Sequence, residues 1–185
     1  NVLEVVPDES SQTHKLGTAS SPKLNVLEEA TLWANKNAGA LISKASNDEA
    51  IEFAIVFSDT ANYLATTDEK KCMKMILPSI FGPLMKNEWP KQFLDRQMAI
   101  QRQFTATAVS NPHEPPSEDE AGPSVDSVLE ILENKYNPNT GKLLGISDNH
   151  SELKLRCEAW ANLYRELSKL PPNQGGAVVR WLNAP

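Results

Sequence analysis

The chain contains two cysteines and three histidines, the residue types that most often carry nucleophilic or metal chemistry. Cys72 and Cys157 stand far apart, and neither has a second cysteine or a histidine within four residues. A zinc site needs cysteine and histidine ligands at short spacing, and a nucleophile needs a base held beside it. The spacing therefore predicts no zinc site, and it leaves a pairing of either cysteine with His150 as a minor alternative.

Both cysteines lie in apolar patterns of helical period. This favours two buried free thiols over the alternative of a single disulfide between them. His14 and His113 lie in segments whose composition predicts no rigid structure, whereas a catalytic base must be held in a fixed position. The histidines therefore give no evidence for a catalytic site.

Other catalytic and binding motifs are missing from the sequence. There is no Gly-x-Ser-x-Gly elbow, and the pair Gly175-Gly176 has no further glycine to complete a phosphate-binding loop. The acids that follow Ser117 lack the frame of a calcium loop, although they fit the substrate pattern of an acid-directed kinase. We therefore expect no enzymatic activity, no cofactor and no bound metal.

Charge is unevenly distributed along the chain. The net charge is −6 and the sequence pI is about 5.1. Residues 68–104 hold seven basic and four acidic residues, whereas residues 105–135 hold seven acids and one lysine. Ordinary solvated helix faces explain this pattern most simply. The alternative is a local basic groove that binds a nucleic-acid backbone, for which the candidate residues are Lys91, Arg96 and Arg102.

Residues 110–124 contain four prolines, four acids and no large apolar side chain. Such a segment buries too little surface to offset its ordering entropy. The sequence therefore predicts an extended N-terminal arm (1–23), a helical block (24–109), an acidic Pro-rich linker (110–124) and a C-terminal helical block with an apolar tail (125–185).

Helix start signals recur in the first block. Capping-box spacing occurs at Asn25/Glu28, Ser46/Glu49 and Thr66/Glu69. The segment after Ser46 is apolar on more than one face, which is typical of a central helix. Pro78 is expected to kink or split the helix that follows.

Further helices are expected after Pro90, after Ser124 and through Leu153–Leu167, where Pro171-Pro172 ends the pattern. The fold class predicted from these signals is all-α, an irregular bundle of about six to seven helices.

The last long helix carries apolar residues at alternating steps of four and three, a spacing suited to packing against another helix. The predicted interaction residues are Leu153, Trp160, Tyr164 and Leu167 of this helix, and Trp181 of the apolar tail. If the chain is a monomeric helical adaptor or regulatory module, this helix or the acidic linker would bind a protein partner.

The leading functional hypothesis is a non-enzymatic structural protein, an α-helical subunit of a larger assembly of the filamentous coat or nucleocapsid type. Its expected partners are copies of itself and single-stranded nucleic acid, with no membrane. No apolar run is long enough to span a bilayer, and the opening residues do not have the pattern of a signal peptide. These features favour an intracellular or virion-like assembly.

Overall fold

The computed structural model describes residues 37–145 and 151–185. These residues form helices and no strand, so the all-α prediction is confirmed. The predicted arm, the cap at Asn25 and the histidines His14 and His150 lie outside the described residues. After helical residues 37–43 the elements are α2 (Asn47–Thr67), α3 (Glu69–Ile76), α4 (Pro78–Phe81), a 3-10 turn (Lys86–Glu88), α5 (Lys91–Ser110), α6 (Glu118–Lys135), α7 (Thr140–Leu144), α8 (Leu153–Leu167) and α9 (Pro172–Leu182).

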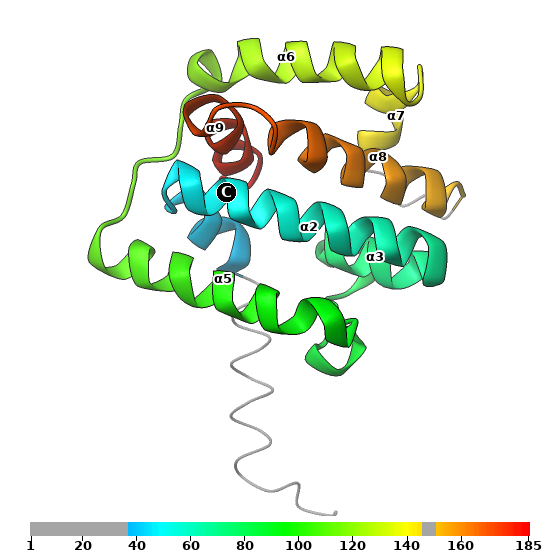
Figure 1. Cartoon of the computed structure of the whole chain (residues 1–185), viewed down its shortest axis with the longest axis horizontal. Helices are drawn as coiled ribbons and strands as arrows, with labels where there is room; N and C mark the ends of the chain where they lie inside the picture. The colour runs from blue at the N-terminus through cyan, green and yellow to red at the C-terminus, as the bar shows by residue number, and fades with distance from the viewer. Residues whose placement is uncertain (1–36, 146–150) are drawn as a thin grey trace, which may run out of the picture.

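Helix α2 lies in the middle of the structure, with α5 on one side and α8 and α9 on the other (Figure 1). It buries residues on most of its surface, as predicted. The predicted cap is confirmed, because Ser46 Oγ accepts from the Glu49 amide at 3.2 Å and Glu49 Oε2 accepts from the Ser46 amide at 2.8 Å. This reciprocal pair satisfies two amides that the first helical turn leaves unbonded.

Small residues recur along α2 at steps of four and three: Ala54, Ser58, Ala61 and Ala65, all buried. They allow α8 to approach closely, and the Ser58 hydroxyl donates to the Ala161 carbonyl of α8 at 2.8 Å. Both groups are buried, so this bond satisfies polar atoms that have left water. The α2–α8 contact is the most extensive between helices of the described chain.

The predicted capping box at Thr66 and Glu69 is wrong. Helix α2 continues to Thr67, and Asp68 caps α3 by accepting from the Lys71 amide at 3.1 Å. The Thr66 hydroxyl instead donates to the Tyr63 carbonyl at 2.9 Å. Asp is a stronger N-cap than Thr, and it directly follows the end of α2. The split predicted at Pro78 is confirmed, since α3 ends at Ile76 and α4 starts at Pro78.

The helix expected to follow Ser124 begins earlier, at Glu118. Ser117 caps it by accepting from the Glu120 amide at 3.3 Å, and Glu120 Oε2 accepts from the Ser117 amide at 2.7 Å. The first turn is acidic, which favours the positive end of the helix dipole. Acids that the sequence analysis assigned to a linker therefore stabilise a helix start.

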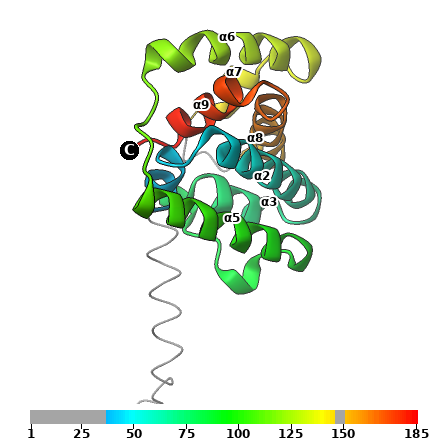
Figure 2. The same ribbon diagram turned by 60° about the vertical axis from the view of Figure 1, so that its left-hand side comes forward.

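The connector between α5 and α6 runs along the edge of the molecule (Figures 1 and 2). The His113 amide donates to the Lys44 carbonyl at 3.0 Å, and Arg180 of α9 donates to the Glu114 carbonyl. Arg180 is buried and also donates to the Ser43 carbonyl, at 3.1 Å. The chain therefore holds its own connector in place.

Helix α9 approaches the start of α2 through two glycines. A Cβ at Gly176 would lie 2.8 Å from Asn47 Cα, and one at Gly175 would overlap the Leu167 carbonyl oxygen of α8 while touching Ile51 of α2. These positions are therefore restricted to glycine by packing.

The two prolines before these glycines separate α8 from α9. Pro171 lies between the two helices, and Pro172 occupies the first position of α9, where its missing amide hydrogen costs nothing.

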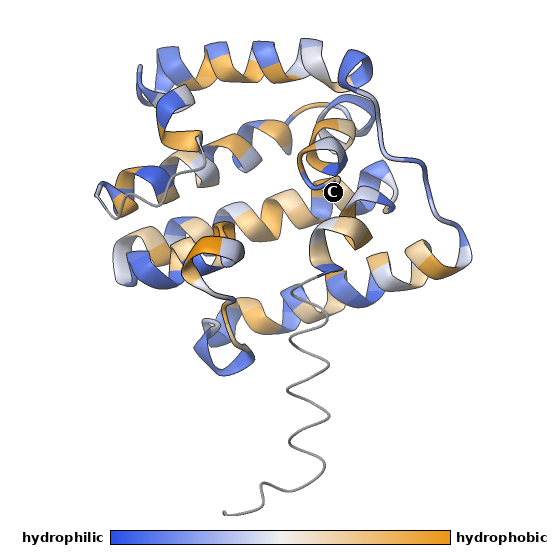
Figure 3. Cartoon of the chain, turned by 180° about the vertical axis from the view of Figure 1, so that it is seen from behind, coloured by the Kyte–Doolittle hydropathy of each residue, from blue (hydrophilic) through white to orange (hydrophobic). Residues whose placement is uncertain are grey.

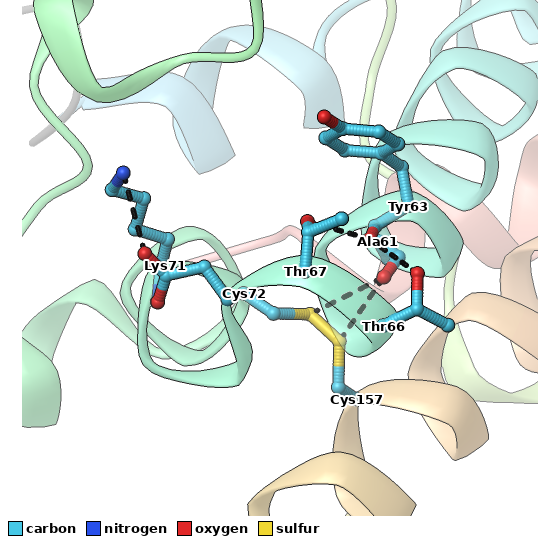
Figure 4. Close-up of a disulfide and its surroundings, with 8 residues drawn as sticks. Ala61, Tyr63, Thr66, Thr67, Lys71, Cys72 and Cys157 are labelled. Carbon is cyan, nitrogen blue, oxygen red and sulfur yellow. Dashed lines mark hydrogen bonds and ion pairs between the residues drawn. A yellow bond between two sulfur atoms is a disulfide. The ribbon is translucent and has the colours of Figure 1, made fainter.

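The preferred prediction of two free thiols is wrong, because Cys72 and Cys157 form a disulfide with a Cα–Cα distance of 6.1 Å. The prediction that both are buried is correct. The bond joins α3 to α8 beside the Ala61 carbonyl of α2, which lies 3.7 Å and 3.2 Å from the two sulfur atoms (Figure 4). The sequence placed each cysteine on an apolar face, but it did not show that the two faces meet.

Helix α6 packs its apolar side toward α8 and α9 (Figure 3). At its end, Glu166 of α8 accepts from Lys135 at 3.0 Å, from Tyr136 at 2.5 Å and from Lys169 at 2.7 Å. Burial alone would raise the pKa of Glu166, but the hydrogen bonds from Lys169, Tyr136 and Lys135 outweigh burial and lower the pKa to about 2. The ionised carboxylate therefore stabilises the contact between α6 and α8.

Reduction of the disulfide is expected to lower the free energy of unfolding by about 2–4 kcal/mol, because the bond closes a long loop and restricts the unfolded chain. The two cysteines are 85 residues apart. Chemical denaturation with and without reductant measures the effect. A variant with Cys72→Ala and Cys157→Ala should not respond to reductant, and an equal response from both proteins would contradict the prediction.

The Glu166 network predicts a stability loss in acid. Its folded pKa lies below the unfolded value of about 4.3, so its contribution is present above that pH and declines as pH falls toward 2. Because Lys135 and Lys169 are half exposed and the titration is incomplete at pH 3, we expect a loss of about 1–2 kcal/mol between pH 7 and pH 3. Denaturation midpoints from pH 7 to pH 3 should fall less steeply for Glu166→Gln than for the exposed control Glu130→Gln; parallel curves would refute the assignment.

Candidate functional site

The three predicted nucleic-acid residues lie exposed on α5. Arg96 Nη1 lies 3.2 Å from Asp59 Oδ2 of α2, so part of its charge is neutralised. Lys91 and Arg102 are about three turns apart on the same side of the helix, with Asp95 between them. The structure places the three cations on one helix but does not gather them in a groove, and their role stays a prediction.

The predicted interaction residues pack within the chain itself. Tyr164 and Leu167 are buried in the main core, against which Trp160 and Trp181 are partly buried. Leu153 is buried in a second, smaller cluster with Met73 and Leu77 of the α3 region. The spacing of four and three along α8 thus marks the side that meets the other helices of this chain. A partner would find little of this seam exposed.

Across residues 37–145 and 151–185, no three His, Cys, Asp or Glu side chains come together in a way that would hold a metal ion. Within the same ranges, every helix is too short or too polar to cross a bilayer.

A cavity of about 360 Å³ lies among α2, the turn from α3 to α5, α8 and the C-terminal end. Its volume is in the range of small-molecule sites, roughly 300–1,000 Å³. Aromatic side chains form much of its lining: Phe53, Phe57, Trp89, Phe104, Trp160 and Tyr164.

The aromatic rings pack against one another behind the cavity. The Phe57 and Tyr164 rings lie 4.2 Å apart, and Phe53 meets Tyr164 edge-on at 5.8 Å. Trp160 stacks with Tyr164 at 6.3 Å. Tilted and edge-on contacts of this kind are the favoured aromatic geometries, so the apolar wall is fixed by its own packing.

Polar groups interrupt this apolar lining. Gln97 of α5 is only 8 % exposed, and its amide has no hydrogen bond with any described residue. The Trp160 indole Nε1–H is buried and has no acceptor within the described chain. The Tyr164 hydroxyl accepts from Asn183 at 3.1 Å. Three polar side chains with unused hydrogen-bonding capacity therefore border one cavity.

The cavity presents no unpaired charge from its described lining. Lys74 is its charged residue, and Lys74 Nζ lies 2.7 Å from Glu88 Oε1. Hydrogen bonds from Lys74 and the Met85 amide lower the pKa of Glu88, so this pair stays ionised. Burial raises the pKa of Tyr164 to about 12, so its hydroxyl keeps its proton at neutral pH. The lining therefore suits a neutral occupant.

Gln97 is not among the site residues predicted from the sequence, although the sequence contains a signal for it. Phe93, Gln97, Ile100 and Phe104 follow the helical spacing of an inward-facing stripe. An amide within such a stripe must be bonded or must border a cavity, because burying it without a partner costs about 1–3 kcal/mol. What the sequence could not show is that Trp160 and Tyr164, from a distant helix, lie on the same cavity.

The two ends of the described fold meet at the rim of the cavity. Ala38, Gly39, Asn183 and Ala184 all line it. A Cβ at Gly39 would lie 2.8 Å from the Asn183 carbonyl oxygen, so the two segments are in direct contact.

Comparison with known family models, with curated proteins and with solved structures found no match.

Proposed function

We propose that the chain is a non-enzymatic structural protein, an α-helical subunit that associates with copies of itself through the segment preceding residue 37. The observation that carries this proposal is the contact between Gly39 and Asn183. Because of it, the N-terminal segment joins the helical body beside the C-terminal end of α9.

The sequence of the arm supports a role in association. Residues 1–23 could span up to about 75 Å if fully extended, well beyond a domain of this size. They include an apolar cluster, Val2, Leu3, Val5 and Val6. Apolar side chains gain free energy when they leave water, and a neighbouring subunit offers a surface on which they can do so.

Nucleic-acid binding is a secondary part of the proposal. Lys91 and Arg102 are exposed on α5 and make no ion pair with another described residue. Two cations bind phosphate weakly in one subunit, but repetition along an assembly multiplies the effect. Single-stranded nucleic acid is therefore a candidate partner of the assembly.

The second candidate function is a monomeric helical adaptor. One observation favours it: the connector is fastened by the chain's own bonds at His113 and Glu114. This segment therefore needs no neighbouring subunit to hold it. Its exposed acid Glu114, together with Glu118 and Asp119 in the first turn of α6, would then meet a basic partner.

Light scattering of the purified full chain separates the two functions. The assembly proposal predicts a mass several times the 20.4 kDa of one chain, and a single-chain mass after deletion of residues 1–23. A control retains the arm's length but replaces Val2, Leu3, Val5 and Val6 by serine, and it should also be monomeric.

A full chain that stays monomeric at all concentrations tested would overturn the assembly proposal and favour the adaptor. Ultraviolet absorbance of the same fractions reports nucleic acid. If nucleic acid is bound, Lys91→Ala with Arg102→Ala should reduce its retention and lower the salt dependence by roughly one unit per lost phosphate contact. Unchanged retention would remove this part of the proposal.

A further inference from the structure

The cavity beside Gln97 calls for an explanation independent of the proposed assembly. Protein interiors are close-packed, and voids larger than a water molecule are few. A partly open space of about 360 Å³ next to the main core is large enough to hold a small molecule. Its lining residues come from segments far apart in the chain, so the whole fold is needed to form it.

Gln97 is the strongest indication of an occupant. Its side chain is more than nine-tenths buried, it borders the cavity, and its amide is unpaired among the described residues. An amide carries two donors and an acceptor. Its amide is not among the fully buried atoms that lack a partner, so it keeps contact with the space of the cavity. A molecule that enters the cavity must therefore pair with this amide or leave it unbonded, and leaving it unbonded costs free energy.

One donor on the facing helix strengthens the argument. The Trp160 Nε1–H is fully buried, so Trp160 contributes the face of its ring to the lining. The Tyr164 hydroxyl receives a hydrogen bond from Asn183 and still has its own proton to donate, with no acceptor among the described residues. An occupant with hydrogen-bond acceptors therefore complements this wall better than one with donors alone.

Water is held weakly over part of this lining, because the aromatic faces of Phe53, Phe57 and Phe104 offer it no hydrogen bonds. A flat apolar molecule gains contact with these rings and releases the water. A charged occupant is disfavoured, because Lys74 at the lining is already paired with Glu88.

We propose that this cavity binds a small neutral molecule that has an aromatic or alicyclic body and a carbonyl-type oxygen, with the oxygen accepting a hydrogen bond from the Gln97 amide. The apolar body lies against the aromatic wall of α2, α5 and α8. This binding site does not depend on the proposed self-association, since its described lining comes from a single chain.

Two probes of nearly equal shape test the site on the ¹⁵N-labelled full chain. Acetophenone has the carbonyl oxygen, and ethylbenzene lacks it. We expect acetophenone to bind roughly tenfold more tightly, the effect of one buried hydrogen bond. The Trp160 indole resonance, assigned by its loss in Trp160→Phe, should shift as either probe enters, because both place a ring beside the indole.

Gln97→Leu should abolish the preference for acetophenone while ethylbenzene still binds. The matched control is Gln103→Leu on the exposed side of the same helix, where the preference should persist. Circular dichroism establishes that both variants are folded. Failure of both probes to shift Trp160, or equal affinity for the two probes in the unmodified chain, would overturn the proposal.

One further outcome identifies a different occupant. If the full chain binds neither probe but a chain without residues 1–23 binds both, the N-terminal arm fills the cavity, and the small-molecule proposal is wrong. The mass of each protein, measured separately, shows whether self-association is affected. The two proposals can therefore fail independently.

Discussion

Close packing between α2 and α8 determines the positions of most other helices. The small residues Ala54, Ser58, Ala61 and Ala65 bring the two backbones near each other, and the Ser58–Ala161 hydrogen bond crosses their interface. The disulfide then attaches α3 to α8 beside Ala61. Helix α5 packs on the opposite side of α2, and α9 packs near its start. A larger residue in this small-residue stripe would separate α8 from α2 and disturb every site that depends on both.

The same packing leaves the cavity open. Phe53 and Phe57 of α2 and Tyr164 of α8 are held by ring contacts, so they cannot collapse into the space in front of Gln97. The Gln97 amide borders this space and makes no hydrogen bond with a described residue, so it is free to bind an occupant.

Local signals in the sequence were sufficient for much of the fold. Apolar period and capping chemistry predicted the all-α class, the start of α2 at Ser46 and the break at Pro78, because these depend on residues within one or two turns. The error at Thr66 arose because Thr66 and Asp68 are both suitable N-cap residues for the next helix, and the structure uses Asp68. The error at Ser117 arose because prolines and acids suggested a linker, although the Ser117/Glu120 spacing is itself a capping box.

Contacts between distant segments were beyond such reasoning. The pairing of Cys72 with Cys157 and the meeting of Gln97 with Trp160 and Tyr164 depend on how helices cross, which no local period specifies. The residues of the α8 seam were correctly chosen as a helix-packing face, but their neighbour is α2 of the same chain. For the same reason, sequence alone could not separate an interaction surface from a core.

Amide hydrogen exchange tests the central role of the α2–α8 packing most directly. If this contact organises the fold, amides in the middle of α2 and α8 will exchange slowest and only through global unfolding, whereas those of α5 and α6 will exchange through smaller openings. Slower exchange in α5 or α6 than in α2, or independent opening of α2 and α8, would contradict the account.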